Sequence, residues 1–459
     1  MELGWLTITP PLLAIVVAVW TRNVFWALGI AILLAETMIA GFNPLMGILG
    51  SIDRAVGVFD SPYNTRVLLF CLIIGALIVY MQRSGGISAM VERLQSSGFA
   101  STPRRASLVT AICGVLIFVE TNISLLTTGI LGRPLFDKLN ISRERLAYII
   151  DSTCAPISVI ILFNGWGAYL LGLLNENEVE GAIGVLMATI GLNFYAWITI
   201  ALVFFTVFTN RTFGPLAAVE KVSAGQSADI KGGVFNEAPA PPSNSLYMAI
   251  PLIIMIGGTI GFMIWTGDGD IRNGSGSQAI LWSVILATVA AFFCLAHSRR
   301  AKGELVDLGF KGMGDLLPAV TMIFLALVLG ASLNAVGMRE FIASIAESFP
   351  APWAIPAILF LAAAITSFTA GTSWGTYGII IPVAVPLATG AGVPMPLAIA
   401  AVMGGGVFGD HCSPISDTTI IASLASGCDH MEHVRTQLPY AVFGGAIATL
   451  LYVLAALSM

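Results

Sequence analysis

Residues 409–419 read Gly-Asp-His-Cys-Ser-Pro-Ile-Ser-Asp-Thr-Thr and lie within an apolar stretch, 394–424, that is long enough to cross a bilayer. Proline inside a spanning helix removes a backbone donor and clashes with the preceding turn, so Pro414 should break this helix and free nearby carbonyl groups. Two carboxylates, Asp410 and Asp417, flank the break. Carboxylates inside a membrane are costly and are functional by default. The stretch therefore predicts a broken membrane helix that carries an ion site.

The composition of the whole chain indicates a membrane protein. Of 459 residues, 57% are hydrophobic and 10% are charged, whereas about a quarter of the residues of a soluble domain are charged. The net charge of -5 belongs to short polar intervals, so no basic patch for nucleic acid is expected. The six cysteines have no paired spacing and are interpreted as packing residues. The N-terminus lacks the basic start and cleavage site of a signal peptide, so the first apolar run is expected to remain as a membrane helix.

The apolar runs predict an all-α polytopic fold. A spanning helix needs about 20 mostly apolar residues, and two further stretches are too long for one crossing and are interrupted midway by small polar residues. A re-entrant hairpin, which enters and leaves on one side, accommodates both properties. We therefore predict two hairpins, at 106–136 and 353–390, and about ten spanning helices, near 5–20, 24–41, 66–82, 146–175, 181–208, 245–265, 278–297, 317–336, 394–424 and 437–457.

The basic residues predict the orientation. If each hairpin returns to its own side, Arg54, Arg66, Arg272 and Arg339 fall on one side, and the other 17 of the 21 Lys and Arg residues fall on the opposite side. The positive-inside rule places the larger set in the cytoplasm. This predicts a multi-pass protein of the bacterial inner membrane with both termini outside, in the periplasm.

Two parts of the chain resemble one another. The pattern S-x-x-T-x-G occurs in both hairpins, starting at Ser124 and at Ser373, and Cys154-Ala-Pro-Ile-Ser158 corresponds to Cys412-Ser-Pro-Ile-Ser416. Matches in the same order indicate an internal repeat, and an odd number of crossings between corresponding elements makes the two units inverted. The predicted organisation is N-terminal scaffold helices (1–65), repeat 1 (66–208), a cytoplasmic linker (209–244), connecting helices (245–316) and repeat 2 (317–459).

The polar residues of these units suggest how ions are held. Pro156 and Pro414 should each break a helix, and the hairpin tips that face them across the repeat are rich in hydroxyl and amide groups. Hydroxyl, carbonyl and carboxylate oxygens replace the hydration shell of a small alkali cation. The candidate ligands at the tips are Asn122, Ser124, Thr127, Thr372, Ser373 and Thr376. Asn164, Trp166 and Trp374 are candidates for an organic-substrate pocket, although tryptophan is more often a packing residue.

The carboxylates suggest proton coupling. Asp410, Asp417, Glu120 and Asp151 lie in or beside the broken and hairpin segments, with His411 next to Asp410. A carboxylate in a low-dielectric site holds a proton more tightly and can exchange it for a cation. Asp151 could alternatively cap a helix or pair with a nearby arginine, and His411 could be a polar neighbour without a role. His430 and His433 are expected to be loop residues, with spacing that is wrong for zinc.

The motif G-D-x-x-S-P-x-S-D-T-T at 409–419, together with Gly371-Thr-Ser-Trp-Gly-Thr-Tyr-Gly378, resembles the NhaC-type Na+/H+ antiporter family. The resemblance implies an elevator-type fold, in which a transport domain slides against a scaffold, and a homodimer. It also implies that Ser413, Ser416 and Thr418 belong to the cation and proton site. Na+ is then expected at Asp410, Ser373, Thr376 and Asp417, as transported or coupling ion, and no other cofactor is expected.

The leading hypothesis is secondary antiport of cytoplasmic Na+ against external H+. The alternative keeps the fold but makes the protein a Na+- or H+-coupled carrier of a small organic solute, an organic acid or amino acid, bound between Asn122 and Thr372. Two inverted units argue against a channel, because alternating access needs that symmetry and a pore does not. An enzyme is disfavoured because the sequence shows neither a nucleophile paired with a general base nor a set of metal ligands.

Overall fold

The structure is a computed structural model that describes residues 4–21, 23–96, 101–118, 121–223, 240–269, 274–300 and 304–458. No described residue lies in a β-strand. The chain begins with α1 (Thr9–Thr21), α2 (Val24–Ile39) and α3 (Pro44–Gly57), and 3-10 turns occupy Gly4–Ile8, Val58–Asp60 and Pro352–Ala354. The all-helical prediction is confirmed.

The helices of the predicted repeat 1 run from α4 to α11. They are α4 (Pro62–Arg83), α5 (Gly86–Ser96), α6 (Pro103–Leu116), α7 (Thr121–Lys138), α8 (Arg143–Ile160), α9 (Gly165–Glu176), α10 (Ala182–Leu192) and α11 (Phe194–Thr209). The middle of the chain forms α12 (Gly214–Ser223), α13 (Leu246–Thr266), α14 (Gly276–Ser298) and α15 (Leu305–Asp315). The predicted repeat 2 contains α16 (Leu317–Ala335), α17 (Met338–Ala346), α18 (Ile355–Ala370), α19 (Ser373–Gly390), α20 (Met395–Cys412), α21 (Asp417–Ser426) and α22 (His430–Ser458).

The number of spans is smaller when length and apolarity alone are counted. Among the described residues, seven helices could cross a bilayer, or up to nine if each of two bent pairs is one span. The bent pairs are α2 with α3, at 115°, and α8 with α9, at 45°. The short helices α3, α12 and α15 were not predicted, because a search for long apolar runs overlooks short or amphipathic helices. The count of ten therefore stays a prediction.

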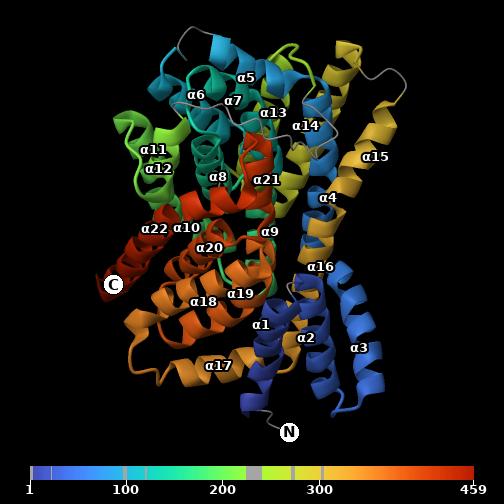
Figure 1. The fold of residues 1–459 in the computed structure, drawn as a ribbon. Helices are drawn as coiled ribbons and strands as arrows, with labels where there is room; N and C mark the ends of the chain where they lie inside the picture. Colours follow the sequence, from blue (N-terminus) through green and yellow to red (C-terminus); the bar gives the residue numbers. More distant parts are fainter. Residues whose placement is uncertain are drawn as a thin grey trace.

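The two predicted hairpins each consist of two helices that contact one another, α6 with α7 and α18 with α19. Figure 1 places α6 and α7, with α5, at one end of the molecule, and α18 and α19, with α17, toward the other. The second hairpin turns at Gly371, whose φ is +67°. A Cβ there would lie 2.6 Å from the carbonyl oxygen of Ile415, so the tip can approach the break after α20 only with glycine.

The two broken segments differ from the prediction in one respect. Pro414 lies in the break between α20 and α21, but Pro156 lies inside α8, which continues to Ile160. The prediction that Pro156 breaks its helix is wrong, and the break occupies residues 161–164 instead. There Asn164 caps α9, because its Oδ1 accepts hydrogen bonds from two backbone N–H groups. The predicted span at 181–208 falls within one candidate span, Ala182–Lys221, in which Asn193 caps α11 and separates it from α10.

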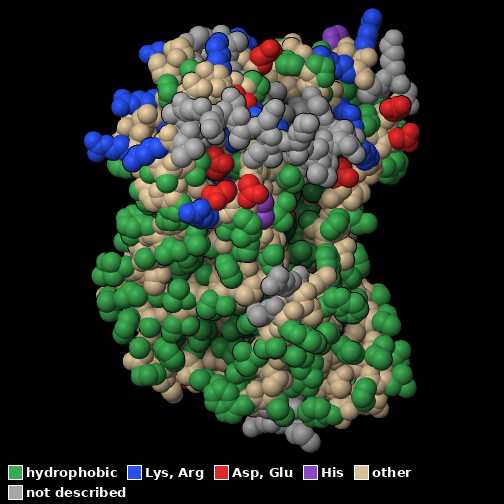
Figure 2. Space-filling view, viewed as in Figure 1, with side chains coloured by type: hydrophobic (Ala, Val, Ile, Leu, Met, Phe, Trp, Pro, Cys, Tyr) green, Lys and Arg blue, Asp and Glu red, His purple; other side chains and the backbone are tan. Residues whose placement is uncertain are grey.

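Charge is distributed unevenly over the surface. The face seen in Figure 2 carries its Lys and Arg side chains at and near the end formed by α5, α6 and α7, and hydrophobic side chains cover most of the rest. The N-terminus lies at the opposite end (Figure 1). An apolar body with a basic end is the pattern that the positive-inside rule expects of a membrane protein.

Candidate functional site

The buried carboxylate of Asp410 is the centre of the candidate ion site. Its side chain is 2% exposed and accepts hydrogen bonds from three hydroxyl groups. Ser416 Oγ lies 2.8 Å from Oδ1, and Ser373 Oγ and Thr418 Oγ1 each lie 3.3 Å from Oδ2. Ser416 Oγ also lies 2.9 Å from Thr418 Oγ1. Five side-chain oxygens are therefore gathered in one place.

Three separate elements hold this oxygen cluster in place. Asp410 is near the end of α20, Ser373 is the first residue of α19, and Thr418 belongs to the first turn of α21. Ser416 is the N-cap of α21 and accepts a hydrogen bond from the backbone N–H of Thr419. Because Ser373, Ser416 and Thr418 stand at the N-terminal ends of α19 and α21, helix ends and not flexible loops hold their hydroxyl groups.

The cluster has the chemistry of a small-cation site. Hydroxyl groups can donate to the carboxylate or turn their lone pairs toward a cation, so the same oxygens suit an ion-free and an ion-bound state. The predicted ligands Thr376, Ser413 and Asp417 lie outside the cluster. Thr376 Oγ1 donates to the Thr372 carbonyl, and Ser413 Oγ donates to the Phe368 carbonyl. Asp417 is exposed and accepts from the Thr418 N–H.

Asp417 faces a cavity of about 280 Å³, here called the tip cavity. Asn122 at the first hairpin tip and Thr372 at the second line it together, as the alternative hypothesis expected. The remaining walls come from α4, from the start of α16 and from Asp315 at the end of α15. The tip cavity therefore lies where both hairpins, both breaks and the neighbouring helices meet.

Aromatic rings form one wall of the tip cavity. The rings of Trp166 and Trp374 are 4.7 Å apart, and Tyr169 stacks on Trp374 at 5.1 Å and 10°. Tyr169 also donates its hydroxyl to the Trp374 carbonyl, at 2.9 Å. Asn164 lies behind this wall and is fully buried, and its amide donates to the carbonyls of Phe118 and Ser158. It therefore organises the wall and does not itself line the cavity.

The first hairpin tip makes a different set of contacts. Ser124 Oγ lies 3.0 Å from Cys154 Sγ and 3.2 Å from the Gly114 carbonyl oxygen, and Thr127 is buried nearby in the same helix. In the register that matches Cys154 with Cys412, Ser152 takes the place of Asp410. Glu120 lies outside the described residues. Within the described part of the chain, the first half brings no carboxylate to the position that corresponds to Asp410.

Asp151 belongs to a second buried polar group, at the contact of α8 with α22. Its Oδ2 accepts from His433 Nε2 at 3.2 Å and from Gln437 Nε2 at 2.6 Å, and all three side chains are buried. Gln437 also donates to the His411 carbonyl, and His411 Nδ1 lies 3.1 Å from Tyr195 Oη. Asp151 Oδ1 has no hydrogen-bond partner among the described residues. The buried polar group thus joins four helices.

The prediction that His430 and His433 are loop residues is wrong, because both belong to α22. His430 Nε2 lies 2.7 Å from the Pro414 carbonyl oxygen, one of the groups freed by the break. The sequence contained a signal that the last helix begins before residue 437. A search for apolar runs begins the last helix at 437, whereas Asp429 precedes His430 and offers a capping carboxylate whose Oδ1 accepts the Glu432 N–H.

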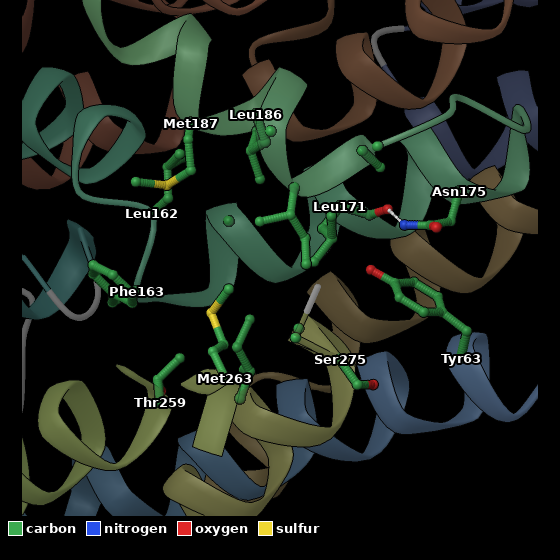
Figure 3. A pocket seen from close by; sticks show the side chains of 18 of the residues that line it. Tyr63, Leu162, Phe163, Leu171, Asn175, Leu186, Met187, Thr259, Met263 and Ser275 are labelled. Carbon is green, nitrogen blue, oxygen red and sulfur yellow. Dashed lines mark hydrogen bonds between the residues drawn. The ribbon is translucent and has the colours of Figure 1, made fainter. Parts of the chain in front are cut away.

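A larger cavity than the tip cavity lies elsewhere and has no charged lining residue. It measures about 770 Å³ and lies against α9, α10, α13 and α14 (Figure 3). Its lining is mainly apolar, with Leu171, Leu186 and Met263 among the labelled side chains, and the described lining residues include no charged side chain. The cavity offers no carboxylate to balance the charge of a cation, so the Asp410 cluster is the better candidate for the ion site.

Comparisons with known proteins agree on one family. A model of the Na+/H+ antiporter family matches residues 166–457. An uncharacterized protein of Haemophilus influenzae is 30% identical over 95% of this chain and 88% of its own length. The arginine/ornithine antiporter ArcD of Halobacterium salinarum is 30% identical over 42% of this chain and 39% of its own length. The malate-2H+/Na+-lactate antiporter of Bacillus subtilis is 38% identical over 21% of this chain and 22% of its own length.

A solved structure shares the fold. The YdaH transporter of Alcanivorax borkumensis, described as having an unusual topology, superposes with a TM-score of 0.57 over 89% of this chain and 88% of that one. The two sequences are 14% identical. At this level of identity the likeness concerns the arrangement of helices alone.

Proposed function

The chain belongs to the Na+/H+ antiporter family, and we propose that it exchanges Na+ for H+ at the Asp410 oxygen cluster. The observation that carries the proposal is a carboxylate with 2% exposure that is held by three hydroxyl groups, one from the start of α19 and two from the start of α21. One site that binds either Na+ or H+ is sufficient for antiport, because each ion must leave before the other can bind. Asp410 is the group for which the two ions compete.

The other carboxylates take secondary roles in this proposal. Asp417 is exposed to the tip cavity and attracts the cation on its way to Asp410. The Asp151 and His433 pair is buried at the contact of α8 with α22 and is proposed as a further proton-binding group. Neither carboxylate replaces Asp410, which alone is surrounded by hydroxyl oxygens.

The mechanism that we propose is alternating access by two inverted units. The recurring order of elements, from α4 to α9 and from α16 to α21, supports the repeat. The placement of α6 and α7 at one end and of α18 and α19 toward the other supports the inversion (Figure 1). The units move as an elevator within a homodimer in the bacterial inner membrane. The basic end of the molecule faces the cytoplasm, and both termini lie outside.

Exchange of an organic solute is the second candidate function. Two of the related antiporters carry names that specify organic solutes, arginine and ornithine in one and malate and lactate in the other. The tip cavity, with about 280 Å³ and two tryptophans in its wall, is larger than a bare ion requires. Both functions use Asp417, since it lies beside the ion site and faces the cavity.

Liposomes test the first function. Purified protein is reconstituted with a pH-sensitive dye inside, and Na+, Li+ or K+ is added outside. Na+ should drive protons out of the liposomes, and protein-free liposomes should show no response. Asp307→Asn, an exposed carboxylate on α15 away from the oxygen cluster, is the control that should exchange normally. Folded protein that moves no protons on addition of any of the three cations contradicts the proposal.

A further inference from the structure

We propose that the tip cavity binds a small organic cation, and that the ammonium group of this solute pairs with Asp417 and Asp315. The inference rests on the proposed function, since it names the class of solute that the same transport site accepts. It also argues against the organic acids that the alternative hypothesis left open.

The charges that line the tip cavity are all negative. Asp315 and Asp417 are both exposed and both face it, from the end of α15 and the start of α21. No Lys, Arg or His is found among the described residues that line it. An organic anion would meet two carboxylates and no basic partner, which is a repulsive arrangement. A cation meets two counter-charges.

The side-chain carbonyl oxygen of Asn122 also needs a hydrogen-bond donor. Asn122 lines the cavity, and its Oδ1 is buried without a hydrogen-bond partner among the described residues. A buried acceptor without a partner is costly, so a ligand that donates a hydrogen bond to it is favoured. An ammonium group carries three donors and no acceptor. It satisfies Asn122 and the carboxylates together.

The aromatic wall supplies a third attraction for a cation. The Trp166 and Trp374 rings meet at 47°, and Trp374 is fixed by the stacked ring and hydroxyl of Tyr169. Trp166 is fixed from behind by the hydrogen bond from its Nε1 to Thr121. Because indole faces attract cations within about 6 Å, two rigid indoles form a prepared surface for an ammonium group.

The apolar side chains that α4 and α16 contribute to the tip cavity suit the hydrocarbon part of the solute. They are Cys71, Ile74 and Ile78 of α4 and Val320 and Ile323 of α16. Gly165 also lines the cavity, and a Cβ at this residue would lie in van der Waals contact with the Trp374 ring, at 3.4 Å. A cavity of about 280 Å³ is at the small end of ligand pockets. The solute is thus an amine with a short aliphatic chain.

Thermal unfolding in Na+-free buffer tests the charge of the solute. Lysine, norleucine and 2-aminoadipate share one backbone and differ in the charge at the end of the side chain, and 1,5-diaminopentane has two ammonium groups and no carboxylate. Lysine and the diamine should raise Tm by about 2 °C or more at saturation, and norleucine and 2-aminoadipate should not. Stabilisation by 2-aminoadipate, or by none of the four, overturns the inference.

Variants test the residues. Asp315→Asn should abolish the stabilisation by the diamine, whereas Asp307→Asn on the same helix should retain it. Trp374→Leu should weaken binding of the diamine about tenfold, and Trp374→Phe should weaken it less, because the ring face is kept. Stabilisation that survives both Asp315→Asn and Trp374→Leu places the amine elsewhere and overturns the inference.

Proton movement measured on the same preparations separates the two proposals. If Na+ drives proton movement but no amine stabilises the protein, the inference about the solute fails alone. If amines stabilise the protein and Na+ drives no proton movement, the proposed Na+/H+ exchange fails and the assignment of the cavity stands.

Discussion

The substitution Asp410→Asn should abolish proton-coupled exchange while leaving the fold intact. Asparagine keeps the shape of the side chain, and its carbonyl oxygen can still accept from Ser416, whose Oγ lies 2.8 Å from Oδ1 in the wild type. It loses the negative charge and the ability to bind a proton. Because the site keeps its shape, the effect should appear in ion binding more than in stability.

The magnitude follows from the burial of the carboxylate. Two unit charges about 4 Å apart attract by about 4 kcal/mol where the effective dielectric constant is about 20. Desolvation offsets part of this attraction, so a net loss of about 2 to 4 kcal/mol is expected, which corresponds to about 30- to 1,000-fold weaker Na+ binding. A carboxylate with 2% exposure is poorly screened by salt, so the loss should persist at high ionic strength.

The assay for Asp410→Asn is the liposome measurement, with the external Na+ concentration varied over four decades and a matched Asp307→Asn preparation alongside. Wild type and Asp307→Asn should reach half-maximal proton efflux at the same Na+ concentration, and Asp410→Asn should give no efflux at any concentration. Proton efflux by Asp410→Asn with an unchanged half-saturating Na+ concentration would refute the assignment of Asp410.

Three further substitutions test separate parts of the site. Ser416→Ala removes an oxygen of the cluster and the cap of α21. It should raise the half-saturating Na+ concentration about tenfold and lower the unfolding free energy by about 1 kcal/mol. Wild-type values for both would exclude the Ser416 hydroxyl from the site. Gly371→Ala should lower the unfolding free energy by about 1 to 3 kcal/mol more than Gly392→Ala does. The two glycines have φ values of +67° and +68°, but of the two only Gly371 has a carbonyl oxygen within 3 Å of the added Cβ. Equal Tm values for the two variants in thermal scans would show that the hairpin tip relaxes. His433→Ala should cost about 3 kcal/mol by removing a partner of buried Asp151, and adding Asp151→Asn should recover most of that loss in denaturant titrations, whereas additive losses would argue against the pairing.

The sequence determined the fold class and predicted the centre of the candidate ion site. Long apolar runs admit only helices in a bilayer, because every backbone group must be satisfied internally. The run that contains Asp410 was conspicuous for a related reason, since a carboxylate and a proline in such a segment are both costly. The Ser373 hydroxyl and the hydroxyl groups after Pro414 were found by pattern, and the structure brings Ser373, Ser416 and Thr418 to the carboxylate.

Only the tertiary structure could distinguish the side chains that contact Asp410 from chemically similar side chains nearby in the sequence. Thr376 and Ser413 have the same hydroxyl chemistry as Ser373, but their hydroxyl groups are used by backbone carbonyls. Asn164 resembles a substrate ligand in the sequence and is a helix cap in the structure. A side chain's role depends on which groups lie within about 3 Å of it, and that proximity is set by helix packing.

The sequence by itself thus determined that the chain is a helical membrane protein and predicted a candidate ion site at a broken helix, because those properties depend on local composition and on the cost of burying charge. The tertiary structure decided that His433 meets Asp151 across 282 positions of the chain, and that Asn122, Asp315, Trp374 and Asp417 surround one cavity. These contacts join helices far apart in sequence. No periodicity or local motif encodes them, because they arise only when the helices pack.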